Sequence, residues 1–168
     1  MLCFALLIIF VLVSACSRRE VPPATVGVTN LVVGLMRQDD RGEWRVYSPG
    51  SRFPLVPNGS CTVAKKQQTC MWYGFEFDYT TSTAEEILMC RAKFNKPTDM
   101  VTAEKMETPD THDATFAIPL LELAGHYAQS ANVFRNPDDS PAPWTVEISC
   151  KHNAQEVIHF NFTALHES

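Results

Sequence analysis

The most regular hydrophobic pattern in the chain runs through residues 70–79, Cys-Met-Trp-Tyr-Gly-Phe-Glu-Phe-Asp-Tyr. Large apolar side chains occupy every second position, and smaller or charged residues occupy most positions between them. Because successive side chains of a β-strand point to opposite faces, this alternation predicts a strand with one face in the core. The residues predicted to face the core are Met71, Tyr73, Phe75, Phe77 and Tyr79, and those predicted to face away are Gly74, Glu76 and Asp78. Trp72 is the exception, a large aromatic side chain predicted on the outer face.

Shorter segments rich in β-branched or alternating residues predict further strands along the chain. They cover residues 26–37, 44–47, 114–118, 144–150 and 156–165. In the last two segments the residues predicted to face inward are Trp144, Val146, Ile148, Cys150, Ile158, Phe160, Phe162 and Ala164. His159 and Asn161 are predicted to face outward.

Residues 82–94 fit two kinds of secondary structure. Ser82 with Glu85 matches the capping box that opens a helix, yet Leu88, Cys90, Ala92 and Phe94 alternate as in a strand. The strand is favoured, because Cys90 then faces the core as Cys150 does, and the two cysteines can meet.

Proline, glycine and clustered polar residues predict the loops between these strands. The longest predicted loops are residues 48–60, 95–113 and 135–144. Between two of the strands, Pro119 can begin a short helical turn and Gly125 can end it.

This predicted turn lies just before Tyr127, and it resembles the E–F corner of immunoglobulin-like domains. In that corner a tyrosine hydroxyl bonds to backbone upstream of it. The antibody pattern itself is absent, since no Trp follows Cys90 at the expected distance and no Tyr lies two residues before Cys150. We therefore expect an all-β fold, an immunoglobulin-like β-sandwich of about seven or eight strands with one short helical turn.

The N-terminus has a different character. Residues 1–15 are almost wholly apolar and uncharged, but a membrane-spanning helix needs about 20 such residues. The run is therefore typical of a signal peptide. It ends in Val13-Ser14-Ala15-Cys16, which resembles the lipobox of bacterial lipoproteins. That resemblance implies cleavage before Cys16 and a diacylglycerol on its thiol, and Ser17 in place of aspartate favours the outer membrane.

The chain thus divides into a signal peptide (1–15), a lipid-anchored tether (16–25) and a β-sandwich domain (26–168). The tether contains Pro22-Pro23, which favours an extended conformation. Two alternatives remain open. Ordinary cleavage would give a soluble secreted glycoprotein, with the sequons at Asn58 and Asn161 in use, and an uncleaved N-terminus would act as an anchor.

Composition narrows the classes of partner. Removal of residues 1–15 leaves 153 residues (168 minus 15), which suits one domain, and these carry the whole net charge of −5. A mildly acidic chain without a Lys/Arg cluster argues against nucleic-acid binding. The partners expected are the membrane, through the lipid on Cys16, and a protein of the cell envelope.

Six cysteines are present, of which Cys3 and Cys16 lie in or next to the signal peptide. The four others allow three disulfide pairings in an exported protein. A short loop favours Cys61–Cys70, which leaves Cys90–Cys150. A zinc site is the competing interpretation, but the sequence has no CxxC or HxxxH spacing, so we expect no bound metal.

A search for catalytic residues finds no convincing set. There is no GxSxG or SxxK pattern, and no Gly-rich phosphate loop. All five histidines fall in predicted loops, at chain ends or on an outward strand face: His112, His126, His152, His159 and His166. The adjacent pairs His112-Asp113, Glu85-Glu86 and Asp138-Asp139 are interpreted as surface or turn residues. We therefore expect no enzyme activity, no cofactor and no small-molecule substrate.

The function expected from the sequence is that of a non-catalytic lipoprotein on the periplasmic face of the outer membrane. It would act as a binding or assembly module, in a secretion system or as an immunity-type inhibitor of a toxin or lysozyme. Exposed Trp residues are over-represented at interface hot spots, and Trp72 lies beside the expected Cys61–Cys70 loop. The loops 48–60 and 135–144 are candidate partner-binding edges. The residues predicted to bind the partner are Trp72, Asn58, Asp138 and Asp139. An envelope hydrolase with a dispersed active site is a further alternative.

Overall fold

The structure is a computed structural model that describes residues 23–63, 65–95, 101–102, 105–106, 113–133 and 143–165. Within these ranges the protein is all-β and contains no helix. The strands are β1 (Val26–Gln38), β2 (Trp44–Pro49), β3 (Arg52–Pro54), β4 (Gly59–Val63), β5 (Lys66–Thr81), β6 (Glu86–Phe94), β7 (Val101–Thr102), β8 (Lys105–Met106), β9 (Asp113–Leu120), β10 (Ala124–Val133), β11 (Trp144–His152) and β12 (Gln155–Leu165).

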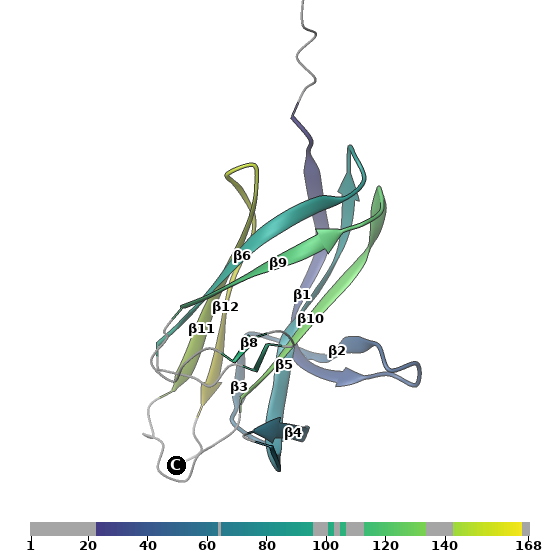
Figure 1. Cartoon of the computed structure of the whole chain (residues 1–168). Coiled ribbons are helices and arrows are strands. Elements are labelled where there is room, and N and C mark those ends of the chain that lie inside the picture. The colour runs from purple at the N-terminus through teal and green to yellow at the C-terminus, as the bar shows by residue number, and fades with distance from the viewer. Residues whose placement is uncertain are drawn as a thin grey trace, which may run out of the picture.

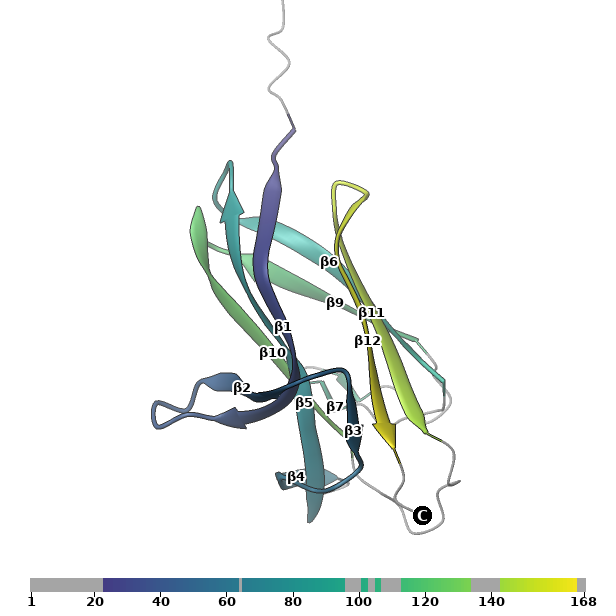
Figure 2. The same ribbon diagram turned by 180° about the vertical axis from the view of Figure 1, so that it is seen from behind.

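Ten of these strands form two five-stranded sheets (Figures 1 and 2). The first, called here the β5 sheet, has the order β10-β5-β1-β2, with β4 also paired to β5. The second, called the β11 sheet, has the order β3-β12-β11-β6-β9. Neighbouring strands are antiparallel except for β3, which runs parallel to β12. Strands β7 and β8 form a separate pair.

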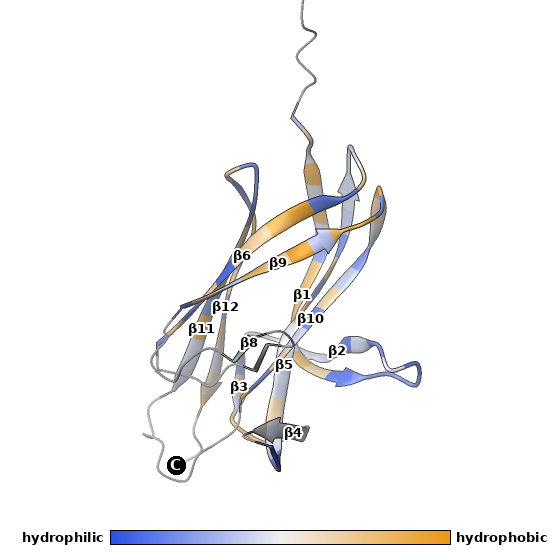
Figure 3. Ribbon diagram, viewed as in Figure 1, coloured by the Kyte–Doolittle hydropathy of each residue, from blue (hydrophilic) through white to orange (hydrophobic). Residues whose placement is uncertain are grey.

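The core lies between the two sheets, and β5 supplies much of it. Met71, Tyr73, Phe75, Phe77 and Tyr79 are all buried, as their alternation predicts. Residues of both sheets meet there: the Tyr73 ring stacks on Phe162 of β12 at 4.7 Å between centroids, and Phe75 lies 5.1 Å from Phe160. Apolar residues accordingly alternate with polar ones along many strands (Figure 3). Burial of these aromatic side chains in the core is the main force that holds the sheets together.

The β1–β2 hairpin departs from the plane of its sheet and projects sideways (Figures 1 and 2). The pairing of β1 with β2 shifts register between Leu35 and Met36. Beyond that point Met36 is buried, although it precedes a hairpin tip that is exposed. Its Sδ and the carbonyl oxygen of Gln129 occupy the space that a Cβ on Gly74 would need. Gly74, predicted to face away from the core with Glu76 and Asp78, is therefore buried beneath the hairpin rather than exposed.

The predicted helical turn between Pro119 and Gly125 is wrong. Pro119 lies in β9 and pairs with Ile87, and after a turn at 121–123 the chain continues as β10. A proline has no N–H to donate, but β9 is the edge strand of its sheet, where that loss is tolerated. Tyr127 makes no tyrosine corner either, because its hydroxyl donates to Oε1 of Gln129 at 2.8 Å.

Two other segments also differ from expectation. Residues 48–60 are not one long loop, because they contain β3 and the start of β4. The strand predicted within 82–94 is confirmed, but it begins at Glu86. Residues 82–85 form a turn in which Glu85 has φ 63°, so no helix is capped there.

Both expected disulfides are present, Cys61–Cys70 and Cys90–Cys150. Each joins neighbouring strands of one sheet. Cys90 and Cys150 are directly opposite residues of β6 and β11, with Cα atoms 4.0 Å apart. Cys61 and Cys70 link β4 to β5 with a Cα separation of 5.9 Å. Neither bridges the two sheets, unlike the B–F disulfide of antibody domains.

Candidate protein-binding surface

Of the four residues predicted to bind a partner, the structure brings Asn58 and Trp72 together. Asp138 and Asp139 lie outside the described residues, as does Cys16. Asn58 directly precedes β4, and Trp72 lies on the outer face of β5, two residues after Cys70. Both residues are half-buried.

The side-chain amide of Asn58 bonds to the backbone of Trp72 as a neighbouring strand would. Asn58 Oδ1 accepts from the Trp72 N–H at 2.6 Å, and Asn58 Nδ2 donates to the Trp72 carbonyl at 3.0 Å. The backbone N–H of Asn58 donates to the Cys70 carbonyl at 3.0 Å. Asn58 therefore has a structural role that sequence reasoning did not assign to it: it extends the β4–β5 pairing by side-chain bonds.

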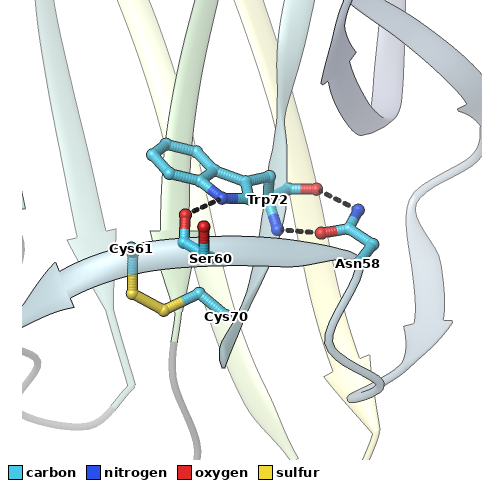
Figure 4. The surroundings of a disulfide bond; sticks show 5 residues. All are labelled: Asn58, Ser60, Cys61, Cys70 and Trp72. Atoms are coloured by element: carbon cyan, nitrogen blue, oxygen red, sulfur yellow. Dashed lines mark hydrogen bonds between the residues drawn. A yellow bond between two sulfur atoms is a disulfide. The ribbon is translucent and has the colours of Figure 1, made fainter. Parts of the chain in front are cut away.

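The Trp72 indole is fixed by a further bond, as Figure 4 shows. Its Nε1 donates to the Ser60 carbonyl at 3.0 Å. The ring lies close over Gly59, where a Cβ would be 2.8 Å from Trp72 Cδ1. The Cys61–Cys70 disulfide closes the same hairpin. The orientation of the ring is thus set before any partner arrives, which reduces the entropy lost on binding.

Two aromatic residues of β2 join Trp72. The Trp44 ring lies 4.5 Å from that of Trp72 between centroids. Tyr47 is 41% exposed, its hydroxyl lies 3.3 Å from Asn58 Nδ2, and the Arg37 guanidinium lies 5.2 Å from the centre of its ring. We call Trp44, Tyr47 and Trp72 the aromatic surface. Sequence reasoning missed Trp44 and Tyr47, because the bend of the hairpin that carries them has no local signal.

A polar network occupies the outer face of β5 further along the strand. His126 Nδ1 lies 2.9 Å from Asp78 Oδ1, and its Nε2 lies 3.5 Å from Glu76 Oε2. Asn30 Nδ2 donates to the other Asp78 oxygen at 2.8 Å. The bond from Asn30, and then the bond from His126, hold the pKa of Asp78 below its ordinary value. Both ring nitrogens of His126 thus face carboxylates, and these contacts order the side chains on this face.

The other described histidines also lie next to carboxylates. His152 follows the predicted strand 144–150 and was therefore expected in a loop, but it lies on β11 and is 6% exposed. Its Nε2 is 2.8 Å from Glu86 Oε2. The Thr83 hydroxyl, and then His152, lower the pKa of Glu86. His159 is exposed between Glu147 and Glu156, as expected for an outward face.

The other acidic residues singled out in the sequence lie in a turn or pair with a side chain of a neighbouring strand. Glu85 lies in the turn before β6, next to Glu86, which pairs with His152. Asp113 pairs with Arg91 of the neighbouring strand at 2.6 Å. His112 and His166 lie outside the described residues. In the described part of the chain, no three His, Cys, Asp or Glu residues are grouped so as to hold a metal ion. Nor does that part include a helix of the length and apolarity needed to cross a membrane.

Comparison with known proteins does not assign the chain to a family. No protein-family model matches the chain, and a search of curated proteins returns no match.

Proposed function

We propose that the protein is a non-catalytic lipoprotein on the periplasmic face of the outer membrane, where it binds a protein partner through its aromatic surface. The observation that carries this proposal is the separation of two features of the sandwich. The chain enters the domain at one end (Figures 1 and 2), and the aromatic surface lies away from that end, beside the middle of β5 and on the projecting β1–β2 hairpin.

The end at which the chain enters is defined by hydrogen bonds. Thr25 exchanges two bonds with Ser82: its N–H donates to Ser82 Oγ at 2.9 Å, and its carbonyl accepts from the Ser82 N–H at 3.0 Å. Asn153 Nδ2 donates to the Ala24 carbonyl at 3.0 Å. We call this the tether end.

The aromatic surface is far from the tether end along β5. Trp72 and Thr81 are nine positions apart on that strand, which corresponds to about 30 Å at 3.3 Å per residue. A lipid on Cys16 would hold the tether end near the bilayer and direct the aromatic surface into the periplasm. Fixed, partly exposed Trp and Tyr side chains are the residues that most often dominate binding energy.

The charge of the domain favours a basic partner. The chain carries a net charge of −5, and complementary charge speeds association and selects among partners. That chemistry suits an immunity-type inhibitor of a cationic toxin or lysozyme. It equally suits a component of a secretion assembly. The neighbouring genes distinguish the two roles, since a toxin gene in the same operon favours immunity and secretion genes favour assembly.

We also propose that the sandwich belongs to the immunoglobulin-like class. Strands β1, β5 and β10 are ordered as A, B and E of that fold, and β6, β11 and β12 as C, F and G. These correspondences support the proposal. The disulfides within single sheets and the absence of a tyrosine corner are departures from the antibody pattern.

The hydrogen bonds of Asn58 argue against a glycan at this position, and so against one part of the secreted-glycoprotein alternative. A glycan replaces one hydrogen on Nδ2, and that nitrogen already donates to the Trp72 carbonyl and lies near the Tyr47 hydroxyl. Glycosylation at Asn58 would therefore break a bond that orders the aromatic surface. Asn161, by contrast, is exposed on β12.

The proposal is tested by site-specific photocrosslinking in cells that express the full chain. Benzoylphenylalanine at Tyr47 should give one discrete protein adduct, whereas the same group at Thr115, exposed on β9 of the other sheet, should not. The adduct should weaken when Trp44→Ala is added, because this change removes the ring that packs against Trp72 and leaves the bonds from Asn58 to the Trp72 backbone in place. Equal adducts at both positions, or no adduct at Tyr47, would refute binding through this surface.

A further inference from the structure

The outer face of the β11 sheet changes from apolar to charged along a single strand. The outward-pointing residues of β6 are, in order, Ile87, Met89, Arg91 and Lys93, and all are exposed. Ile87 and Met89 are 50% and 58% exposed, which is unusual for large apolar side chains. Their neighbours on β9 follow the same trend, with Pro119 and Ala117 opposite the apolar pair, and Thr115 and Asp113 opposite the basic pair.

The apolar half of this face continues into the turn between β9 and β10. Leu121 is 67% exposed and Leu123 is 58% exposed. The turn is held in place, because the Leu123 carbonyl accepts from the Thr81 N–H at 2.7 Å. Figure 3 shows apolar residues gathered on β6 and β9 toward this end of the sandwich. We call the exposed residues of this region the apolar patch: Ile87, Met89, Pro119, Leu121 and Leu123.

The apolar patch lies at the tether end. Thr81, which holds the β9–β10 turn, precedes Ser82, and Ser82 is bonded to Thr25 where the chain enters the domain. β6 also begins at this end, four residues after Ser82. The basic half of the β6 face, from Arg91 to Lys93, lies further away.

The length of chain before the domain sets how far this end can lie from an anchor. Pro23 lies seven positions after Cys16, and a fully extended chain spans at most about 25 Å over that distance. If Cys16 carries acyl chains, Pro23 is therefore held within about 25 Å of the bilayer. The apolar patch lies at this same end of the domain, whereas the far end of β5 does not.

We propose that the apolar patch rests on the phospholipid surface of the membrane to which the protein is anchored. This inference rests on the proposed lipid anchor. Apolar side chains gain free energy when they enter the boundary between headgroups and acyl chains, and a second contact stabilises the attachment that the acyl chains provide. The exposed Glu122, between Leu121 and Leu123, keeps the contact shallow, because its carboxylate has to remain among the headgroups. A patch in this position also fixes the tilt of the sandwich and holds the aromatic surface away from the membrane.

The test uses the full mature chain with its own N-terminal modification, placed in vesicles of phosphatidylethanolamine and phosphatidylglycerol. Benzoylphenylalanine is introduced at Leu121 or Met89 and, as a matched control, at Lys93 on the same face of β6. After irradiation, intact mass should show a phospholipid adduct at Leu121 and Met89 that is several-fold more abundant than at Lys93. Addition of Leu123→Asp should reduce the adduct at Met89 several-fold without changing the thermal unfolding midpoint.

Equal lipid adducts at all three positions, or none at Leu121 and Met89, overturn the proposal. The same crosslinks made in cells distinguish a protein partner, since a protein adduct at Leu121 in place of a lipid adduct also overturns it. The mass of the N-terminal peptide in the same sample reports on the anchor separately. A free Cys16 together with lipid adducts at Leu121 refutes the anchor and supports the patch, whereas an acylated Cys16 without those adducts refutes the patch alone.

Discussion

The side-chain amide of Asn58 bonds both the N–H and the carbonyl of Trp72, and so takes the place of a neighbouring strand beside β5. These bonds, together with the Cys61–Cys70 disulfide and the bond from Trp72 Nε1 to Ser60, fix the aromatic surface. The geometry of the aromatic surface thus depends on Asn58 and on the β4–β5 hairpin, and each can be altered separately.

Asn58→Ala should lower the free energy of unfolding by about 1–3 kcal/mol, because it leaves the half-buried N–H and carbonyl of Trp72 without these partners. Urea unfolding, followed by tryptophan fluorescence, measures the change. Asn161→Ala, at an exposed position of β12, is the matched control and should change stability by less than about 0.5 kcal/mol. Equal unfolding midpoints for the two variants would contradict the role given to Asn58.

Gly74→Ala should destabilise the domain by about 1–3 kcal/mol or more, since the new methyl group collides with Met36 and with the backbone of β10. The hairpin should also loosen, which would reduce binding of a partner to the aromatic surface. Gly42→Asn is the control: Gly42 has φ 79°, which Asn tolerates, and nothing lies within 4 Å of the position of its Cβ. If Gly74→Ala unfolds at the same urea concentration as the unaltered protein, the hairpin does not pack on β5 as described.

The two disulfides should differ in their contribution to stability. Cys90 and Cys150 are 60 residues apart, whereas Cys61 and Cys70 are 9 apart. The entropy of loop closure predicts losses of about 4 and about 2.6 kcal/mol when each pair is replaced by alanine. Denaturant titration of the two double-alanine variants gives the order directly. A larger loss from the Cys61–Cys70 pair would mean that strain or residual structure outweighs loop entropy.

Stability should fall as the pH is lowered into the acidic range, and Glu86 should contribute to that fall. The Thr83 hydroxyl and His152 hold the pKa of Glu86 below its ordinary value in the folded protein. Its contribution is therefore fully present above the pKa of an unfolded glutamate, about 4.3. It is lost as the pH falls through the lower, folded value.

This dependence is measured by thermal unfolding between about pH 6 and pH 3, across the ordinary glutamate pKa. Glu86→Gln should unfold at a lower temperature than the unaltered protein near pH 6, and the two should converge toward pH 3. Glu122→Gln, in the exposed turn at the same end of the domain, controls for the change in net charge. Parallel curves for Glu86→Gln and the unaltered protein would show that the pair with His152 adds no stability.

Patterns within a single strand were sufficient to predict much of the fold. Strand β5 was predicted because its large residues alternate. The Cys90–Cys150 disulfide was predicted because both cysteines lie on inward faces of alternating segments. Strand β10 was missed because it is rich in small and polar residues such as Ala128, Ser130 and Ala131, and because Pro119 and Gly125 nearby are typical of a turn.

The parts of the site that were missed depend on contacts between distant residues. Trp44 reaches Trp72 only because β1 and β2 shift register and bend over Gly74. His152 meets Glu86 across 66 positions of the chain. The pattern of residue types within a short segment carries no information about such pairs. They meet because the order of strands in the sheets brings distant segments together.

The proposal that a lipid on Cys16 holds the domain at a membrane is tested by the mass of the mature N-terminal peptide from cells that express the full chain. We expect a peptide that begins at Cys16, with a diacylglycerol on its thiol and an acyl chain on its amine. A peptide that begins at Cys16 with a free thiol and a free amine would contradict it, as would a chain that retains residues 1–15.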